Sequence, residues 1–223
     1  VSYAIDATGA VTRFDYDAAG RLTRSIAYYT RIVPGLSTTG LVGHALDRTT
    51  RHEYDKAGRR TYTVDARGYA TGWTYDGGDR VLTETRYAAG PTTWAPITIA
   101  PTAARRTDTY TYDKAGRRLS HTDALGGTER FTVDALGHVL STTNAKGSTW
   151  TYEYDAAGRR ITETSPKVWL TSLGTDAAGR LTEGATVEAA IVTRTAYDAL
   201  GNLTSRTEAA GRAGEERTTR YEY

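Results

Sequence analysis

TYDKAGRRL at residues 111–119 and EYDAAGRRI at residues 153–161 are two copies of one motif, and this motif decides the fold. Its relatives include YDAAGRL at 16–22, EYDKAGRR at 53–60 and AYDALGNL at 196–203. The copies return on a register of about 21 residues, which is typical of repeat architectures. Function therefore has to be inferred from the array rather than from one isolated motif.

The composition favours strands and turns over a deep apolar core. Of the 223 residues only 39% are hydrophobic, and the mean hydropathy is −0.53. Phenylalanine is scarce and methionine is absent, whereas tyrosine and glycine occur 16 and 23 times. This mixture is typical of β-sheets that are partly exposed to solvent and of tight turns. We therefore expect an all-β protein. The lack of methionine also predicts a segment excerpted from a larger protein.

Charge and cysteine content exclude several classes of function. The formal charge is +2, and the 28 basic and 26 acidic residues are interspersed, so no nucleic-acid partner is expected. The absence of cysteine excludes disulfides, thiol catalysis and cysteine-ligated zinc. No apolar run reaches the roughly 18 residues that a spanning helix needs, so this segment is not expected to insert into a membrane.

The motif carries the chemistry of a tight turn. An Asp followed three positions later by Gly is typical of a type I turn, because the carboxylate accepts local backbone N–H groups and Gly adopts positive φ. The turn at Asp76 has Asp79 in the Gly position, and Asp tolerates that conformation better than most residues. We expect thirteen hairpin turns, starting at Asp6, Asp17, Asp55, Asp65, Asp76, Asp113, Asp123, Asp134, Asn144, Asp155, Asp176, Asp198 and Glu208.

The turns fall into two alternating classes. Class A turns, which carry the full motif, start at Asp17, Asp55, Asp76, Asp113, Asp134, Asp155, Asp176 and Asp198; the plainer class B turns start at Asp6, Asp65, Asp123, Asn144 and Glu208. Successive turns of an antiparallel meander lie on opposite rims of a sheet. Two steps of the register carry extra chain, at about 27–47 and 88–106, where a class B turn belongs. Both long loops are thus predicted to project from the class B rim.

Each residue of the motif has a predicted structural role. Tyr precedes Asp in most class A units and should face the residue five positions after the Asp, building an aromatic ladder across the sheet. The Arg four positions after the Asp should pair with it. The predicted structural residues are Tyr16, Asp17, Gly20, Arg21, Tyr54, Asp55, Gly58, Arg59, Tyr75, Asp76, Arg80, Tyr112, Asp113, Gly116, Arg117, Tyr154, Asp155, Gly158, Arg159, Tyr197, Asp198 and Gly201.

The array resembles the RHS/YD-repeat family over essentially all of residues 1–223, on the strength of YDxxGR alternating with TDxxG. This resemblance implies a single repeat domain, a long antiparallel β-hairpin meander that curves or spirals into a hollow shell, as in bacterial RHS toxins, the C components of insecticidal toxin complexes and animal teneurins. It further implies a bacterial, secreted or cell-surface protein. The implied partners are adjoining repeats and an enclosed or C-terminal toxin domain.

Catalytic and ligand-binding interpretations are weaker. The repeated Asp residues could supply a carboxylate pair for glycoside hydrolysis or ligands for calcium, but turn chemistry accounts for each of them, so no catalytic, cofactor or metal site is predicted. The histidines form no metal-ligand pair. Trp94, among the prolines of the second long loop, is the candidate contact residue, although it could equally fold back over the sheet.

Two further expectations remain open. An alternative function is an extracellular module that binds carbohydrate or a cell-surface partner through the long loops and the arginine-rich surface. The sheet edges of such a segment could also pair with those of another copy, so edge-to-edge self-association is expected.

Overall fold

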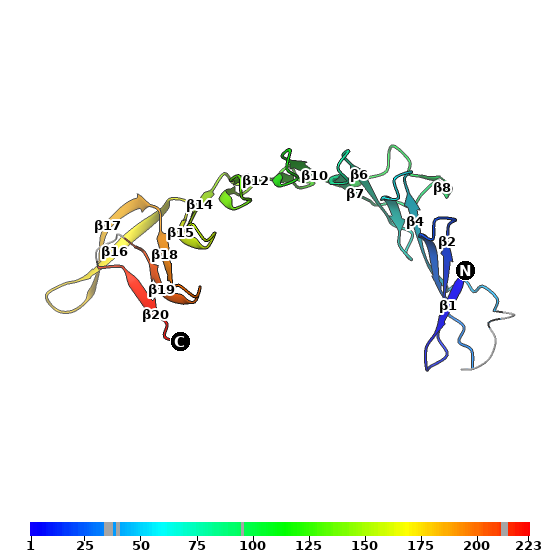
Figure 1. The fold of residues 1–223 in the computed structure, drawn as a ribbon, viewed down its shortest axis with the longest axis horizontal. Coiled ribbons are helices and arrows are strands. Elements are labelled where there is room, and N and C mark those ends of the chain that lie inside the picture. Colours follow the sequence, from blue (N-terminus) through cyan, green and yellow to red (C-terminus); the bar gives the residue numbers. More distant parts are fainter. Residues whose placement is uncertain (34–37, 39–40, 95, 211–213) are drawn as a thin grey trace. The chain divides into compact units, whose positions relative to one another are not determined.

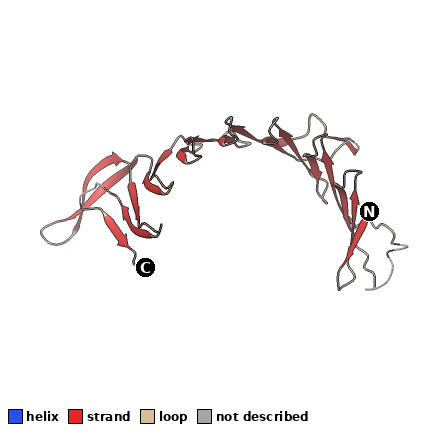
Figure 2. Ribbon diagram, in the orientation of Figure 1, coloured by secondary structure: helices blue, strands red, loops and turns tan. Residues whose placement is uncertain are grey.

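Every regular element in this computed structural model is a β-strand (Figures 1 and 2). The structure describes residues 1–33, 38, 41–94, 96–210 and 214–223, and no helix occurs among them. Sixteen strands form one open antiparallel sheet in the order β1-β2-β3-β4-β5-β6-β7-β10-β11-β12-β13-β14-β15-β18-β19-β20. The predicted all-β hairpin meander is confirmed.

The strands through β10 are β1 (Ser2–Ile5), β2 (Val11–Tyr16), β3 (Leu22–Ala27), β4 (Arg48–Tyr54), β5 (Arg60–Val64), β6 (Ala70–Tyr75), β7 (Val81–Tyr87), β8 (Thr93–Trp94), β9 (Ile97–Thr98) and β10 (Arg105–Tyr112). The remaining strands are β11 (Arg118–Thr122), β12 (Thr128–Val133), β13 (Val139–Thr143), β14 (Thr149–Tyr154), β15 (Arg160–Thr164), β16 (Val168–Thr175), β17 (Leu181–Ala189), β18 (Val192–Tyr197), β19 (Leu203–Glu208) and β20 (Arg217–Arg220).

The chain divides into two compact units. The first comprises Val1–Tyr110 with Asp123–Leu125, and the second comprises Thr111–Thr122 with Gly126–Tyr223. The assignment of residues 1–223 to one repeat domain, and the curvature or spiral of the sheet, stay predictions.

In the first unit the class A hairpins share one irregularity. Tyr54 pairs with Arg60, whereas its neighbour Glu53 pairs with Tyr62, so one residue of β5 bulges out of the ladder. The same shift occurs where Tyr16 pairs with Leu22. A bulge of this kind follows from the residue in positive φ that closes each turn, which is Asp79 at the Asp76 turn and Gly at the other two. The predicted pairing of each Tyr with the residue five positions after the Asp is thereby confirmed here.

Both long connections of the first unit leave from the class B rim, as predicted. The β3–β4 connection starts beside the turn at Asp6, where the amide of Tyr28 donates to the carbonyl of Val11 at 3.0 Å and that of Ile32 to Gly9 at 2.9 Å. The β7–β10 connection starts where Arg86 pairs with Thr71, beside the turn at Asp65.

The second connection does not simply project from the rim, contrary to our expectation. Its strands β8 and β9 form a small separate hairpin, and Ile97 in β9 is only 6% exposed because it packs against Val64 and Ala70 of the main sheet. Burial of this apolar side chain favours the folded-back arrangement.

The turn at Asp176 is not on the class A rim, and this part of the predicted register is wrong. Strands β16 and β17 form a separate two-stranded hairpin with Asp176 at its tip, and β15 pairs directly with β18. Residues 165–191 are thus a third insertion at a class B position. The error arises because the TDAAGR turn closes any hairpin by the same local hydrogen bonds, wherever that hairpin stands.

The last predicted turn is longer than its motif suggests. Glu208 at the end of β19 pairs with Arg217 at the start of β20, so the connection extends well beyond a tight turn. Gly211, the glycine of this unit, lies outside the described residues.

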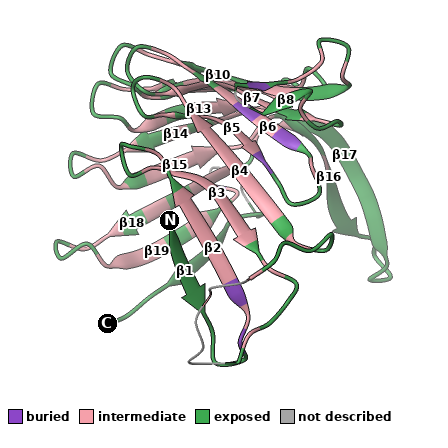
Figure 3. Ribbon diagram, turned by 90° about the vertical axis from the view of Figure 1, so that its right-hand side faces the viewer, coloured by how far each residue is buried: buried purple, intermediate pink, exposed green. Residues whose placement is uncertain are grey.

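The buried core is small (Figure 3). The buried apolar residues among those described are Val11, Val64, Ala70, Ile97 and Ala210. Most strand residues are half-buried, as expected for a sheet without a second layer over most of its face. Its stability must therefore come largely from contacts between neighbouring hairpins.

Candidate functional site

The class A turns are built by backbone contacts to the Asp. At the first of them Asp17 Oδ1 accepts the amides of Ala19 and Arg21, both at 2.9 Å, and the amide of Gly20 donates to the Asp17 carbonyl at 3.0 Å. Gly20 has φ of +77°, the left-handed region that glycine adopts at low cost. Asp79, in the corresponding position of another turn, has φ of +63°, as predicted.

The motif arginine binds the Asp of its own turn. The Nε–Oδ2 distance is 2.7 Å for Arg21–Asp17, Arg59–Asp55 and Arg159–Asp155 and 2.6 Å for Arg80–Asp76 and Arg117–Asp113. The backbone and side-chain donors of Arg21 hold the pKa of Asp17 below its ordinary value. These pairs confirm the predicted cross-turn contact.

The same arginines also reach the next class A turn, a contact that the motif alone does not predict. Arg59 Nη1 donates to the backbone carbonyl of Asp76 at 2.8 Å. The corresponding Nη1 contacts are Arg21 to Asp55 at 3.1 Å, Arg159 to Asp198 at 2.9 Å, and Arg117 to Asp134. One guanidinium therefore joins two hairpins, using donors that point in fixed directions from a rigid plane.

The tyrosines make the return contact. Tyr54 Oη donates to the Leu22 carbonyl at 2.9 Å, and Tyr75 Oη to the Arg60 carbonyl at 2.6 Å. Each ring also lies beneath the arginine of the preceding hairpin, with Arg21 at 5.0 Å from the centroid of Tyr54. Arg59–Tyr75 and Arg159–Tyr197 repeat this stacking at 5.0 and 4.9 Å.

We call this set of contacts the rim ladder: the contacts through which Arg21, Arg59, Arg117, His138 and Arg159 join the Asp of their own turn to the next class A hairpin, together with Tyr54, Tyr75, Tyr154 and Tyr197 of those hairpins. The expected aromatic ladder is therefore interleaved with arginine rather than purely aromatic. The sequence signal for this arrangement is that the motif contains one Tyr and one Arg, so that each Tyr ring can lie against the Arg of the preceding hairpin.

One joint of the rim ladder uses histidine instead of arginine. His138 Nδ1 lies 2.8 Å from Asp134 Oδ2, and its ring stacks on Tyr154 at 4.6 Å with 20° between the planes. Tyr154 Oη donates to the Val139 carbonyl at 3.0 Å. The His138 contact lowers the pKa of Asp134. Another turn places Asn202 in the Arg position, where Nδ2 donates to Asp198 Oδ2 at 2.9 Å.

Tyr16 and Arg180 do not enter these joints in the described contacts. Tyr16 is 46% exposed, and the contacts found among the described residues include none from its hydroxyl. Arg180, at the tip of the projecting hairpin, donates only its amide to the Asp176 carboxylate in the described contacts. Tyr112 ends β10, and Gly116 and Gly158 take positive φ at their turns.

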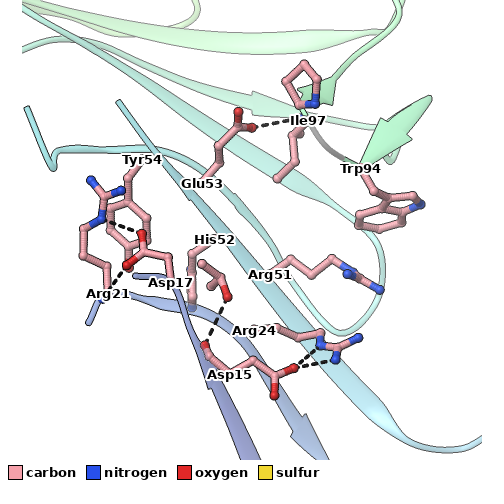
Figure 4. A pocket seen from close by; sticks show the side chains of 12 residues that line it. Asp15, Asp17, Arg21, Arg24, Arg51, His52, Glu53, Tyr54, Trp94 and Ile97 are labelled. Atoms are coloured by element: carbon pink, nitrogen blue, oxygen red, sulfur yellow. Dashed lines mark hydrogen bonds and ion pairs between the residues drawn. The ribbon is translucent and has the colours of Figure 1, made fainter. Parts of the chain in front are cut away.

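Trp94 lies beside a hollow of about 580 Å³ in the first unit (Figure 4). The hollow lies between the face of β3 and β4 and the inserted strands β8 and β9, and Arg51 stacks on the Trp94 ring at 4.6 Å. Trp94 is 50% exposed. The Ile97 amide donates to Glu53 Oε2 at 2.8 Å and fixes the insertion over the sheet. A contact role for Trp94 stays a prediction.

Among the residues that the structure describes, no group of three or more His, Asp or Glu side chains could hold a metal ion. None of the described segments forms a helix long and apolar enough to cross a membrane.

Comparisons with known proteins agree with the sequence motif. The RHS Repeat family model matches residues 2–28, 133–167 and 169–213, which confirms the resemblance to RHS/YD repeats. A search of curated proteins gave no match.

Similar solved structures include TcdB2-TccC3 with Cdc42, with 17% identity and a TM-score of 0.48, and TcdB2-TccC3 alone, with 15% and 0.48. The Photorhabdus luminescens Tc holotoxin pore has 17% identity and a TM-score of 0.46. In each case 96% of this chain is covered but only 12% of the other, so the chain spans a small part of those proteins. Structural similarity at these identities and TM-scores does not assign the function of those proteins to this chain.

Proposed function

Because the chain carries RHS repeats over residues 2–28, 133–167 and 169–213, we propose that it is a structural, non-catalytic wall segment of a bacterial RHS-type shell. Its role is to enclose or present another polypeptide, such as a toxin domain, in a secreted or cell-surface protein. Its immediate partners are adjoining repeats on either side of the sheet.

The observation that carries this proposal is the rim ladder. The joints at Tyr54, Tyr75 and Tyr197 each use one guanidinium and one hydroxyl to fix a hairpin to its neighbour, so a further hairpin can be added without a central core. A protein built in this way produces sheet area rather than an enclosed apolar interior. That property suits a wall. The Asp and Arg residues of the turns, which could otherwise serve a catalytic site, bind each other and so have a structural role.

The test is limited proteolysis of the complete natural protein that contains this segment. If the segment helps to enclose a polypeptide, protease treatment should leave two resistant fragments: the repeats and the enclosed polypeptide. The Tyr54→Phe and Tyr197→Phe substitutions each remove a hydroxyl of the rim ladder. In the double variant the protease should cleave the enclosed polypeptide before it cleaves the repeats. Tyr16→Phe is the matched control. Equal sensitivity in all variants would contradict enclosure.

The alternative of a carbohydrate- or cell-surface-binding module makes a different prediction. A glycan array probed with the purified chain should give no selective signal for a wall segment, whereas a binding module must give one. Selective binding would refute the purely structural role.

A further inference from the structure

The hollow beside Trp94 lies where the β8–β9 insertion folds back over the regular repeat. Its volume of about 580 Å³ falls in the range of about 300–1,000 Å³ typical of small-ligand sites. Its walls come from β2, β3 and β4, and the β8–β9 insertion closes one side (Figure 4). All of its lining residues belong to the first unit, so the site is complete there.

Arg51 is the unusual residue of this hollow. It lies directly across the strand pair from Arg24, and like charges in that position repel each other. Asp15 holds Arg24 at 2.5 Å, but the same carboxylate also holds Arg13 at 2.7 Å. The contacts of the described residues include no ion pair for Arg51. Burial, followed by the charge of Arg24, lowers the pKa of Arg51, with Asp15 acting weakly in the opposite sense.

The ionised residues that line the hollow balance in number: Arg21, Arg24 and Arg51 against Asp15, Asp17 and Glu53. Asp17 binds Arg21, and Asp15 is shared by Arg24 and Arg13, so Arg51 is the lining arginine without a carboxylate partner among the described ion pairs. His52 adds no charge at neutral pH, because burial and then Arg60 lower its pKa. One guanidinium without a carboxylate partner is matched by a monoanion such as a carboxylate, whereas each further negative charge on the ligand would add repulsion from the three carboxylates of the lining.

Arg51 lies over the Trp94 ring, with Cζ 4.6 Å from the ring centroid. The N–H donors of a guanidinium lie in its own plane, where a pair of them matches the two oxygens of a carboxylate. The half-exposed indole also offers apolar surface beside that position. The arrangement therefore combines a charged end with an apolar wall.

We propose that this hollow binds a carboxylate on a short apolar stem, with Arg51 and Arg24 holding the carboxylate and Trp94 covering the stem. The inference rests on the proposed function: the ligand is a Glu or Asp side chain of the polypeptide that the segment presents. A free organic acid carries the same chemistry, so the test separates the two sources.

A second hollow in the other unit provides a matched control. Arg194 precedes Tyr197 as Arg51 precedes Tyr54, and it lines a hollow of about 530 Å³. Arg194 is exposed, however, and lies opposite Thr162 rather than another arginine. The residues lining this hollow include no tryptophan. It should therefore lack the carboxylate site.

The experiment follows the four tryptophan indole N–H signals of the ¹⁵N-labelled chain by NMR, with Trp94→Phe to assign the relevant one. The probes are an acetylated and amidated Gly-Glu-Gly peptide, its Gly-Gln-Gly counterpart, glutarate and sulfate. The Glu peptide should shift the Trp94 signal saturably, and the Gln peptide should bind about tenfold more weakly or less. Arg51→Gln should weaken binding of the Glu peptide by a similar factor, while Arg194→Gln should leave it unchanged.

Each result decides one point. No saturable shift with the Glu peptide, or equal binding by Arg51→Gln, overturns the site; binding of glutarate without the peptide overturns the polypeptide source. Sulfate binding as strong as that of the peptide overturns the choice of a carboxylate. If Arg51→Gln does not fold by circular dichroism, Arg51→Lys replaces it and should bind more weakly than the parent. The titration needs no enclosed polypeptide, so its failure leaves the wall function standing.

Discussion

Removal of the Tyr54 hydroxyl tests whether the rim ladder stabilises the sheet. In Tyr54→Phe the ring remains beneath Arg21, but the 2.9 Å bond to the Leu22 carbonyl is lost. A neutral hydrogen bond of this kind contributes about 1 kcal/mol net, so the free energy of unfolding should fall by roughly 0.5–1.5 kcal/mol. For a cooperative unit of about 100 residues this corresponds to a decrease in Tm of roughly 4 °C.

Urea denaturation of Tyr54→Phe and Tyr16→Phe, followed by tyrosine and tryptophan fluorescence, measures this difference. Tyr16 occupies the same motif position but makes no hydroxyl contact in the described structure, so its substitution should change the free energy by less than about 0.3 kcal/mol. Hydrogen exchange should locate the loss at the amides shared by β3 and β4. Equal effects of the two substitutions would refute the linking role of the tyrosine.

Three other outcomes follow from the same structure. Gly58→Ala should destabilise the chain by about 1 kcal/mol or more because Gly58 has φ of +87°, whereas Gly77→Ala, with open space around it, should be nearly neutral in thermal melts. Ile97→Ala should cost about 2–4 kcal/mol and expose residues 88–104 to protease, while Leu125→Ala, at a side chain 92% exposed, should do neither. The turn carboxylates have lowered pKa values in the folded state, so their stabilisation is complete above the ordinary Asp value of 3.8 and is lost as pH falls through the folded values. Asp155→Asn, which keeps the turn acceptor as Asn144 does naturally, should give a shallower acid-unfolding limb; an unchanged limb would contradict the assignment.

The local part of the structure was accessible from the sequence because it depends on residues close together in the chain. The positive φ of Asp79, the Asp17–Arg21 pair and the pairing of Tyr54 with Arg60 each follow from turn chemistry and the two-residue period of a strand. The alternation of class A and class B turns likewise predicts that the first two insertions leave from the class B rim.

The contacts between hairpins were not accessible in this way. The bond from Arg59 to the Asp76 carbonyl depends on the distance between two hairpins and on the direction of a long side chain. The Asp176 turn was assigned to the wrong rim because its local sequence is that of a class A turn, while the pairing of β15 with β18 is a non-local event.

The strand class, the turn positions and the repeat follow from the amino-acid sequence alone, since each rests on hydrogen bonds within a few residues of the motif. Long-range packing sets which hairpins belong to the main sheet, how one arginine joins two turns, and how the insertion that buries Ile97 places Trp94 beside Arg51 at a hollow. Those features depend on burial and on side-chain contacts between distant segments, which no local periodicity encodes.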